Sequence, residues 1–135
     1  MNCVRILEAA VIASVLASFT DWYFFGILFH DRYHKYGGGV WRQYADKKDE
    51  VRSILAATLS QSVTCFLFIP LCDYFRVTTL LRSLELAGIA WLMLPVPILL
   101  SYAIFLRIDR MIVLSHSLGW LARLAICALC VAWLL

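Results

Sequence analysis

The sequence predicts an all-α integral membrane protein, a four-helix bundle with up-down-up-down topology. Of the 135 residues, 63% are hydrophobic and only 16% are charged, and the mean hydropathy is +0.82. Soluble domains are closer to half apolar and a quarter charged. The twelve basic and nine acidic residues are scattered and give a net charge of only +3, which excludes nucleic acid as a partner. A chain of this length forms a single domain, residues 1–135.

Four apolar runs each approach the roughly 20 residues that a bilayer-spanning helix needs. They cover about residues 4–29, 54–71, 84–106 and 111–135. The runs are apolar on all sides, which fits lipid-embedded helices better than amphipathic helices of soluble proteins. A cleaved signal peptide is the alternative for the first run, but the apolar residues continue to Phe29, beyond a normal signal sequence.

The loop at about residues 30–52 contains half of the basic residues. It holds six lysines and arginines, and the short turn at residues 107–110 holds two more, against three on the opposite side. Because basic residues collect on the cytoplasmic side, we expect both loops in the cytoplasm and both termini outside the bacterial inner membrane. His30 and His34 have a spacing that could share a metal, but no third ligand is evident. No metal or cofactor is therefore expected.

An acidic residue, Asp21, lies inside the first apolar run. A carboxylate at that depth costs roughly 2.5–3.5 kcal/mol to insert, and such residues usually face a partner or a cavity. At 1.5 Å per helical residue, Asp21 and Gln61 each lie about 14 Å from the cytoplasmic ends of their helices. By the same count, His116 and Arg123 lie about 9 Å and 20 Å above the start of the last run, and the long Arg123 side chain can reach back. We therefore predict an Asp21–Arg123 ion pair, with His116 and Gln61 as hydrogen-bond partners.

The third run adds polar groups and a kink at a similar depth. Ser101 lies in its cytoplasmic half, and Pro95 and Pro97 near its middle should kink the helix because they remove backbone donors. The predicted buried polar slab comprises Asp21, Gln61, Ser101, His116 and Arg123. Two roles are open for this slab. It could be a buried ion pair that specifies which helices meet, or it could be part of a ligand or proton pathway.

Five cysteines occur, and two of them, Cys127 and Cys130, form a C-x-x-C pair in the last run. This pair invites comparison with four-helix membrane thiol oxidoreductases that pass electrons to a quinone. No second cysteine pair lies in an outer loop to relay electrons, and apolar burial suppresses thiol reactivity. Packing inside the bundle is therefore the favoured role of these thiols.

Several short motifs carry a family resemblance. The segment Trp22–Phe29 is a Trp-Tyr pair followed by Phe and Leu residues, the third run bears prolines before a short basic turn, and the fourth run contains His116–Trp120 and Trp133. In these features the chain resembles the small four-helix bacterial membrane proteins of domain-of-unknown-function family 1761. That family commonly has a proline and a glycine where this chain has Phe25 and His30. The resemblance implies a membrane bundle and brings no known activity or site residues.

The sequence contains no catalytic constellation, so we expect a non-enzymatic membrane protein. It would be an accessory subunit of a larger membrane complex, or it would hold a small apolar ligand between its helices. One alternative is a small transporter or proton-linked carrier that works as a homodimer and uses Asp21, His116 and Arg123. The other alternative is a quinone-linked thiol oxidoreductase that uses Cys127 and Cys130.

Overall fold

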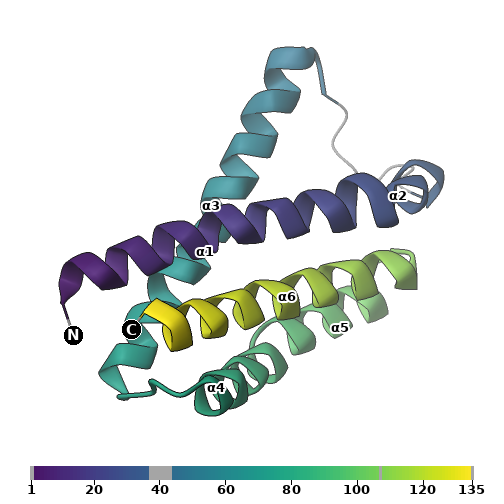
Figure 1. Cartoon of the computed structure of the whole chain (residues 1–135). Coiled ribbons are helices and arrows are strands. Elements are labelled where there is room, and N and C mark those ends of the chain that lie inside the picture. The colour runs from purple at the N-terminus through teal and green to yellow at the C-terminus, as the bar shows by residue number, and fades with distance from the viewer. Residues whose placement is uncertain (1, 37–43, 107, 135) are drawn as a thin grey trace.

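The computed structural model describes residues 2–36, 44–106 and 108–134, and these residues are helical almost throughout, with no strand among them (Figure 1). The helical elements are α1 (Cys3–Tyr23), the π-helical turn η1 (Phe24–Leu28), α2 (His30–Tyr36), α3 (Lys47–Tyr74), α4 (Leu80–Met93), α5 (Pro95–Phe105) and α6 (Arg110–Leu134). The predicted all-α fold class is confirmed.

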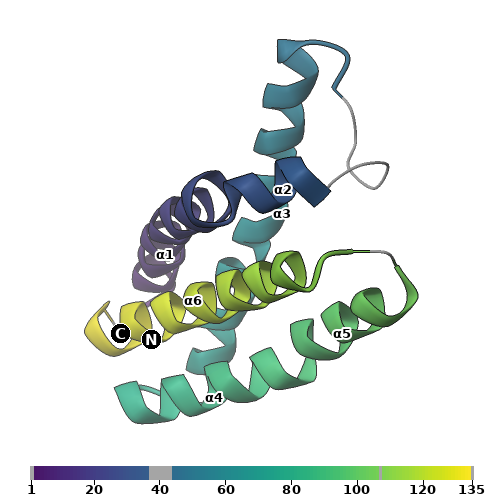
Figure 2. The same cartoon turned by 90° about the vertical axis from the view of Figure 1, so that its right-hand side faces the viewer.

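Four helical stretches of the described chain are long and apolar enough to cross a membrane, as the four apolar runs predict. They are Cys3–Leu28, Lys47–Tyr74, Leu80–Phe105 and Arg110–Leu134. The two ends of the described chain lie at one end of the bundle, and α2 lies at the other end (Figure 1, Figure 2). The direction in which the helices cross the bilayer stays a prediction.

Helix α6 lies at the centre of the bundle and packs against α1, α3, α4 and α5. Small side chains allow these helices to approach closely, as is usual where membrane helices pack. Four buried residues of α1 are alanines, each at most 2% exposed: Ala9, Ala10, Ala13 and Ala17. Cys127 and Ala128 of α6 are fully buried against them and their neighbours. The core is therefore narrow and rich in small residues.

The first helix ends in a π-helical turn. The N–H of Phe29 donates to the carbonyl of Phe24 at 3.0 Å, which closes a ring one residue wider than an α-helical turn. The extra residue rotates the side chains that follow it relative to a continuous α-helix. As a result Phe25 lies against Gly119 of α6, and its ring is 4.7 Å from that of His116.

Helix α3 crosses the other helices obliquely, and its N-terminal half leaves the bundle (Figure 1, Figure 2). It begins at Lys47, well before the predicted start near residue 54, because Asp46 caps it by accepting from the N–H of Asp49 at 2.7 Å. At 28 residues the helix is about 42 Å long, which exceeds the roughly 30 Å hydrocarbon thickness. Its apolar part, about residues 54–71, is about 27 Å long and close to that thickness, so the polar first turns account for the excess length.

The predicted kink in the third run is an interruption at one residue, Leu94, between α4 and α5. Helix α4 ends at Met93, and Pro95 begins α5, since a proline fits the first turn of a helix but not its interior. Helix α4 is tied to α6 by Trp91, whose indole N–H donates to the carbonyl of Ser117 at 2.9 Å. Pro95 is the only buried residue of α5, whereas α4 buries Ser83 and Ala87.

Candidate functional site: a buried polar cluster

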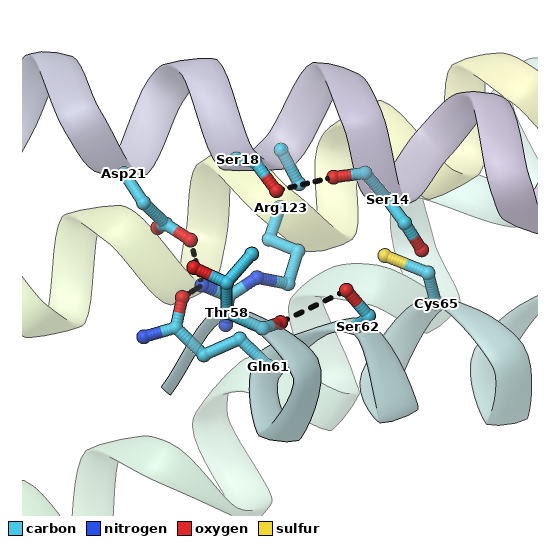
Figure 3. Close-up of a pocket in the computed structure, with 9 residues that line it drawn as sticks. Ser14, Ser18, Asp21, Thr58, Gln61, Ser62, Cys65 and Arg123 are labelled. Atoms are coloured by element: carbon cyan, nitrogen blue, oxygen red, sulfur yellow. Dashed lines mark hydrogen bonds and ion pairs between the residues drawn. The ribbon is translucent and has the colours of Figure 1, made fainter. Parts of the chain in front are cut away.

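A cluster of polar side chains occupies the point where α1, α3 and α6 meet (Figure 3). Arg123 of α6 is only 2% exposed. Its Nη2 donates to Oδ2 of Asp21 on α1 at 2.5 Å and to Oε1 of Gln61 on α3 at 2.7 Å. One guanidinium group therefore joins three helices that are far apart in the sequence.

The surroundings of Arg123 are almost dry and partly aromatic. Its guanidinium carbon lies 5.0 Å from the centre of the Trp120 ring, a distance at which the ring face attracts a cation. The side chain of its partner Asp21 is 13% exposed. A pair this deeply buried contributes little net stability, because desolvation offsets attraction, but loss of one partner is expensive.

The second carboxylate oxygen of Asp21 has no hydrogen-bond partner among the described residues, although it is buried. This Oδ1 atom faces Gly119, where a Cβ would lie 3.5 Å away. Leaving a buried acceptor unsatisfied costs about 1–3 kcal/mol. The cluster is therefore incompletely satisfied, and its geometry depends on how closely α1 approaches Gly119.

Hydroxyl groups line the narrow recess beside the ion pair, between α1 and α3. Ser14, Ser18, Thr58 and Ser62 each donate to the carbonyl four residues earlier in their own helix, at 2.8–2.9 Å. Their hydroxyl hydrogens are thus used within their own helices, and the hydrogen bond to Arg123 from this side comes from Gln61. The recess is too narrow to hold even a water molecule. This arrangement favours a structural brace over a binding cavity.

The structure separates two members of the predicted slab from the ion pair. His116 lies beside the cluster among aromatic rings, with ring centres 4.7 Å from Phe25 and 5.9 Å from Tyr33. Ser101 is exposed on α5, and its hydroxyl donates to the carbonyl of Pro97 at 2.9 Å. The break before α5 sets the direction in which Ser101 points, and depth counting cannot supply that direction.

Sequence reasoning missed a contact that closes the α2 end of the bundle. The hydroxyl of Tyr33 on α2 lies 3.1 Å from that of Ser115, which is fully buried on α6. The ring of Tyr33 also packs edge-on against Phe25, with ring centres 5.9 Å apart. The sequence held one signal for a close contact on this face of α6: two small residues, Ser115 and Gly119, lie four residues apart and so share one face of the helix.

Burial gives Tyr33 a testable titration. Desolvation raises the pKa of its phenol from 10.0 to about 12, and the hydrogen bond to Ser115 lowers it by less. Because the pKa is higher in the folded state, the stability that this group contributes is complete below pH 10 and is lost between pH 10 and 12. Phenolate absorbance should show a step near pH 12 that disappears in Tyr33→Phe. The step should persist in Tyr44→Phe, which removes an exposed phenol, and its persistence in Tyr33→Phe would contradict the assignment.

The five cysteines are all free thiols. Cys127 is fully buried and interacts across the helix interface with Cys65 of α3, which is also fully buried. Cys130 is 6% exposed, whereas Cys3 is exposed near the start of α1. The C-x-x-C thiols thus pack inside the bundle, in surroundings unsuited to electron relay.

Among the described residues, no group of three His, Cys, Asp or Glu side chains lies close enough together to hold a metal ion. His30 is exposed on α2. The side chain of His34 lies outside the described part of the chain, so the predicted spacing of these two residues is not tested.

Four helical stretches that are long and apolar enough to cross a membrane, three of them joined through Arg123, indicate a protein of the helical membrane class. The model of the family described as protein of unknown function DUF1761 matches residues 9–132, nearly the whole chain. The chain belongs to this family, and the resemblance carried by its Trp-Tyr, proline and His-Gly-Trp motifs is confirmed. No curated protein and no solved structure matches the chain.

Proposed function

We propose that the protein is a non-enzymatic accessory subunit of a complex in the bacterial inner membrane. Its helices would cross the bilayer alternately up and down, with both termini outside and α2 on the cytoplasmic side. The observation that carries this proposal is the N-terminal half of α3, which leaves the bundle and has no buried residue.

The free half of α3 presents large apolar side chains on several sides. Val51, Ile54 and Leu55 are each at least 50% exposed, and Leu59 is 69% exposed. Helices that pack into a bundle bury one face, as α6 does, whereas this segment buries none. Its surface is therefore available to neighbouring helices along a length of several turns.

The polar residues of this segment favour a protein neighbour over lipid. Ser60 is exposed, and the amide nitrogen of Gln61 points away from the ion pair (Figure 3). In a bilayer such groups gain little from acyl chains, and they commonly form hydrogen bonds between helices.

The ion-pair cluster supports a structural role for the bundle itself. Its recess has no room for a ligand, and its hydroxyls are satisfied within their own helices. The cluster fixes α1, α3 and α6 at their crossing point, which holds the free half of α3 in place. The bundle would thus act as a scaffold that presents one helix to a partner.

Site-specific photocrosslinking in native membranes tests the proposal. A photoreactive amino acid at Leu55 or Leu59 should give one discrete product of higher mass, and that mass distinguishes a second copy from another subunit. Matched controls are Leu67 on the other half of α3 and Leu81 on α4, which are 67% and 69% exposed. Lipid adducts alone at all four positions would overturn the proposal.

A further inference from the structure

A second surface feature lies on the opposite side of the bundle, where α5 separates from α6. A groove of about 410 Å³ runs between these helices, within the 300–1,000 Å³ range of ligand pockets in proteins. Its walls are almost entirely aliphatic, and its lining residues include Val96, Leu100, Ile104, Val113 and Leu114. This surface is distinct from the free half of α3 on which the proposed subunit role depends.

The groove follows from the sequence. Pro95 ends the α4 helix and starts α5 in a new direction, so α5 does not bury itself against α6 as α4 does. The aliphatic side chains that would otherwise fill an interface remain open: Leu100 is 55% exposed and Ile104 is 76% exposed. The tight α4–α6 contact, held by Trp91, ends at about the level where the groove begins.

The length of the groove fits one leaflet of a bilayer. From Val96 to Ile104 the α5 helix rises about 12 Å, and one leaflet of a roughly 30 Å hydrocarbon core is about 15 Å thick. The proline break lies near the middle of the third spanning stretch, so the groove occupies the half that ends at the α5–α6 turn. An acyl chain lying along it would keep its normal depth.

Among the described residues that line the groove, one is a cation, at the end near that turn. Arg110 lines it, is exposed, and forms no ion pair with any of the described residues. Asp109 beside it caps α6 by accepting from the N–H of Met111 at 2.8 Å, so one of its oxygens is engaged. The other described residues that line the groove are uncharged, so Arg110 is the charged group among them that a ligand headgroup would meet.

We propose that the α5–α6 groove binds one anionic phospholipid, with an acyl chain along the aliphatic walls and the headgroup phosphate on Arg110. An arginine guanidinium pairs with phosphate through charge-assisted hydrogen bonds, and a cation at the leaflet surface favours anionic over zwitterionic headgroups. The bound lipid supplies the packing that the proline break denies to α5.

Photolabelling of the full chain in vesicles tests this proposal. The vesicles contain phosphatidylcholine and a trace of either phosphatidylglycerol or phosphatidylcholine that carries a diazirine on one acyl chain. Peptides of α5 and α6 should be labelled by phosphatidylglycerol about fivefold more than by phosphatidylcholine, the ratio that corresponds to about 1 kcal/mol for one arginine near the surface. Arg110→Gln should reduce this ratio to about one, and Arg82→Gln, which removes an exposed cation on α4, should leave it unchanged.

A second variant separates the groove from general lipid contact. Leu100→Trp fills the groove and should lower labelling of α5 and α6 by phosphatidylglycerol to the level of phosphatidylcholine. Leu67→Trp, on the exposed side of α3, should leave the ratio unchanged. Equal labelling by the two lipids in the unaltered protein, or an unchanged ratio in Arg110→Gln, would overturn the proposal. Failure here leaves the α3 crosslinking result unaffected, because the two experiments report on different helices.

Discussion

Replacing Arg123 by glutamine should destabilise the folded bundle by about 3–5 kcal/mol, the cost of leaving a buried charge without its partner. The substitution keeps hydrogen-bonding capacity and removes the charge that joins Asp21 to Gln61. Combining it with Asp21→Asn removes the remaining charge, so the double variant should recover most of the lost stability. The measurement is the free energy of unfolding of the purified protein in mixed micelles, from denaturant titration followed by circular dichroism.

Arg82→Gln is the matched control, since it removes an exposed arginine from the bundle surface and should change stability by less than about 0.5 kcal/mol. Near-additive losses in the double variant would mean that Asp21 and Arg123 are not energetically coupled. In that case the close contact between them would carry no structural role, and the bundle would depend on its small-residue packing alone.

Substitution of Gly119 by leucine is the second change with a large expected effect. A Cβ at this position lies 3.4 Å from the Phe25 ring and 3.5 Å from Oδ1 of Asp21, which is ordinary contact. Alanine should therefore be tolerated, but the longer leucine side chain must displace either the ring or the carboxylate. We expect a loss of about 3 kcal/mol from overpacking and from strain on the ion pair.

Gly88→Leu provides the control for this substitution. Nothing lies within 4 Å of a Cβ at Gly88, although it is also a helical glycine. Both leucines bring the same gain in helix propensity, about 1 kcal/mol over glycine, so the difference between the variants isolates packing at the cluster. Similar stability of the two leucine variants would show that α1 can move away from α6 at little cost.

Counting residues along the helices predicted which ionisable groups meet, because the rise per residue is constant. Asp21, Gln61 and Arg123 come from three separate runs: the first two lie at about the same depth, and Arg123, about 6 Å deeper by the same count, has a side chain long enough to reach them. The composition likewise predicts four apolar helices, since a bilayer accepts few charges. Both inferences use only one coordinate of each residue, its depth along the membrane normal.

Rotation about the helix axis and the angle between helices could not be predicted in the same way. Ser101 has a suitable depth, but it lies on an exposed side of α5, and depth alone carries no information about that side. The π-helical turn at Phe24 changes the direction in which Phe25 points, and no residue type predicts such a turn. The first turns of α3, from Lys47, are mostly polar and lie outside the apolar run that predicts this helix, so hydropathy alone could not locate its start. These features depend on packing between helices that a single sequence does not encode locally.

The order of the helices along the chain bears on how the protein is made. Asp21 is synthesised 102 residues before Arg123. At about 5–20 residues per second, the ribosome needs on the order of 5–20 s to cover that distance. During this interval α1 carries an unpaired carboxylate at a depth that costs roughly 2.5–3.5 kcal/mol. In a bilayer, the carboxylate of α1 would therefore gain its charged partner only after α6, the last helix, is made.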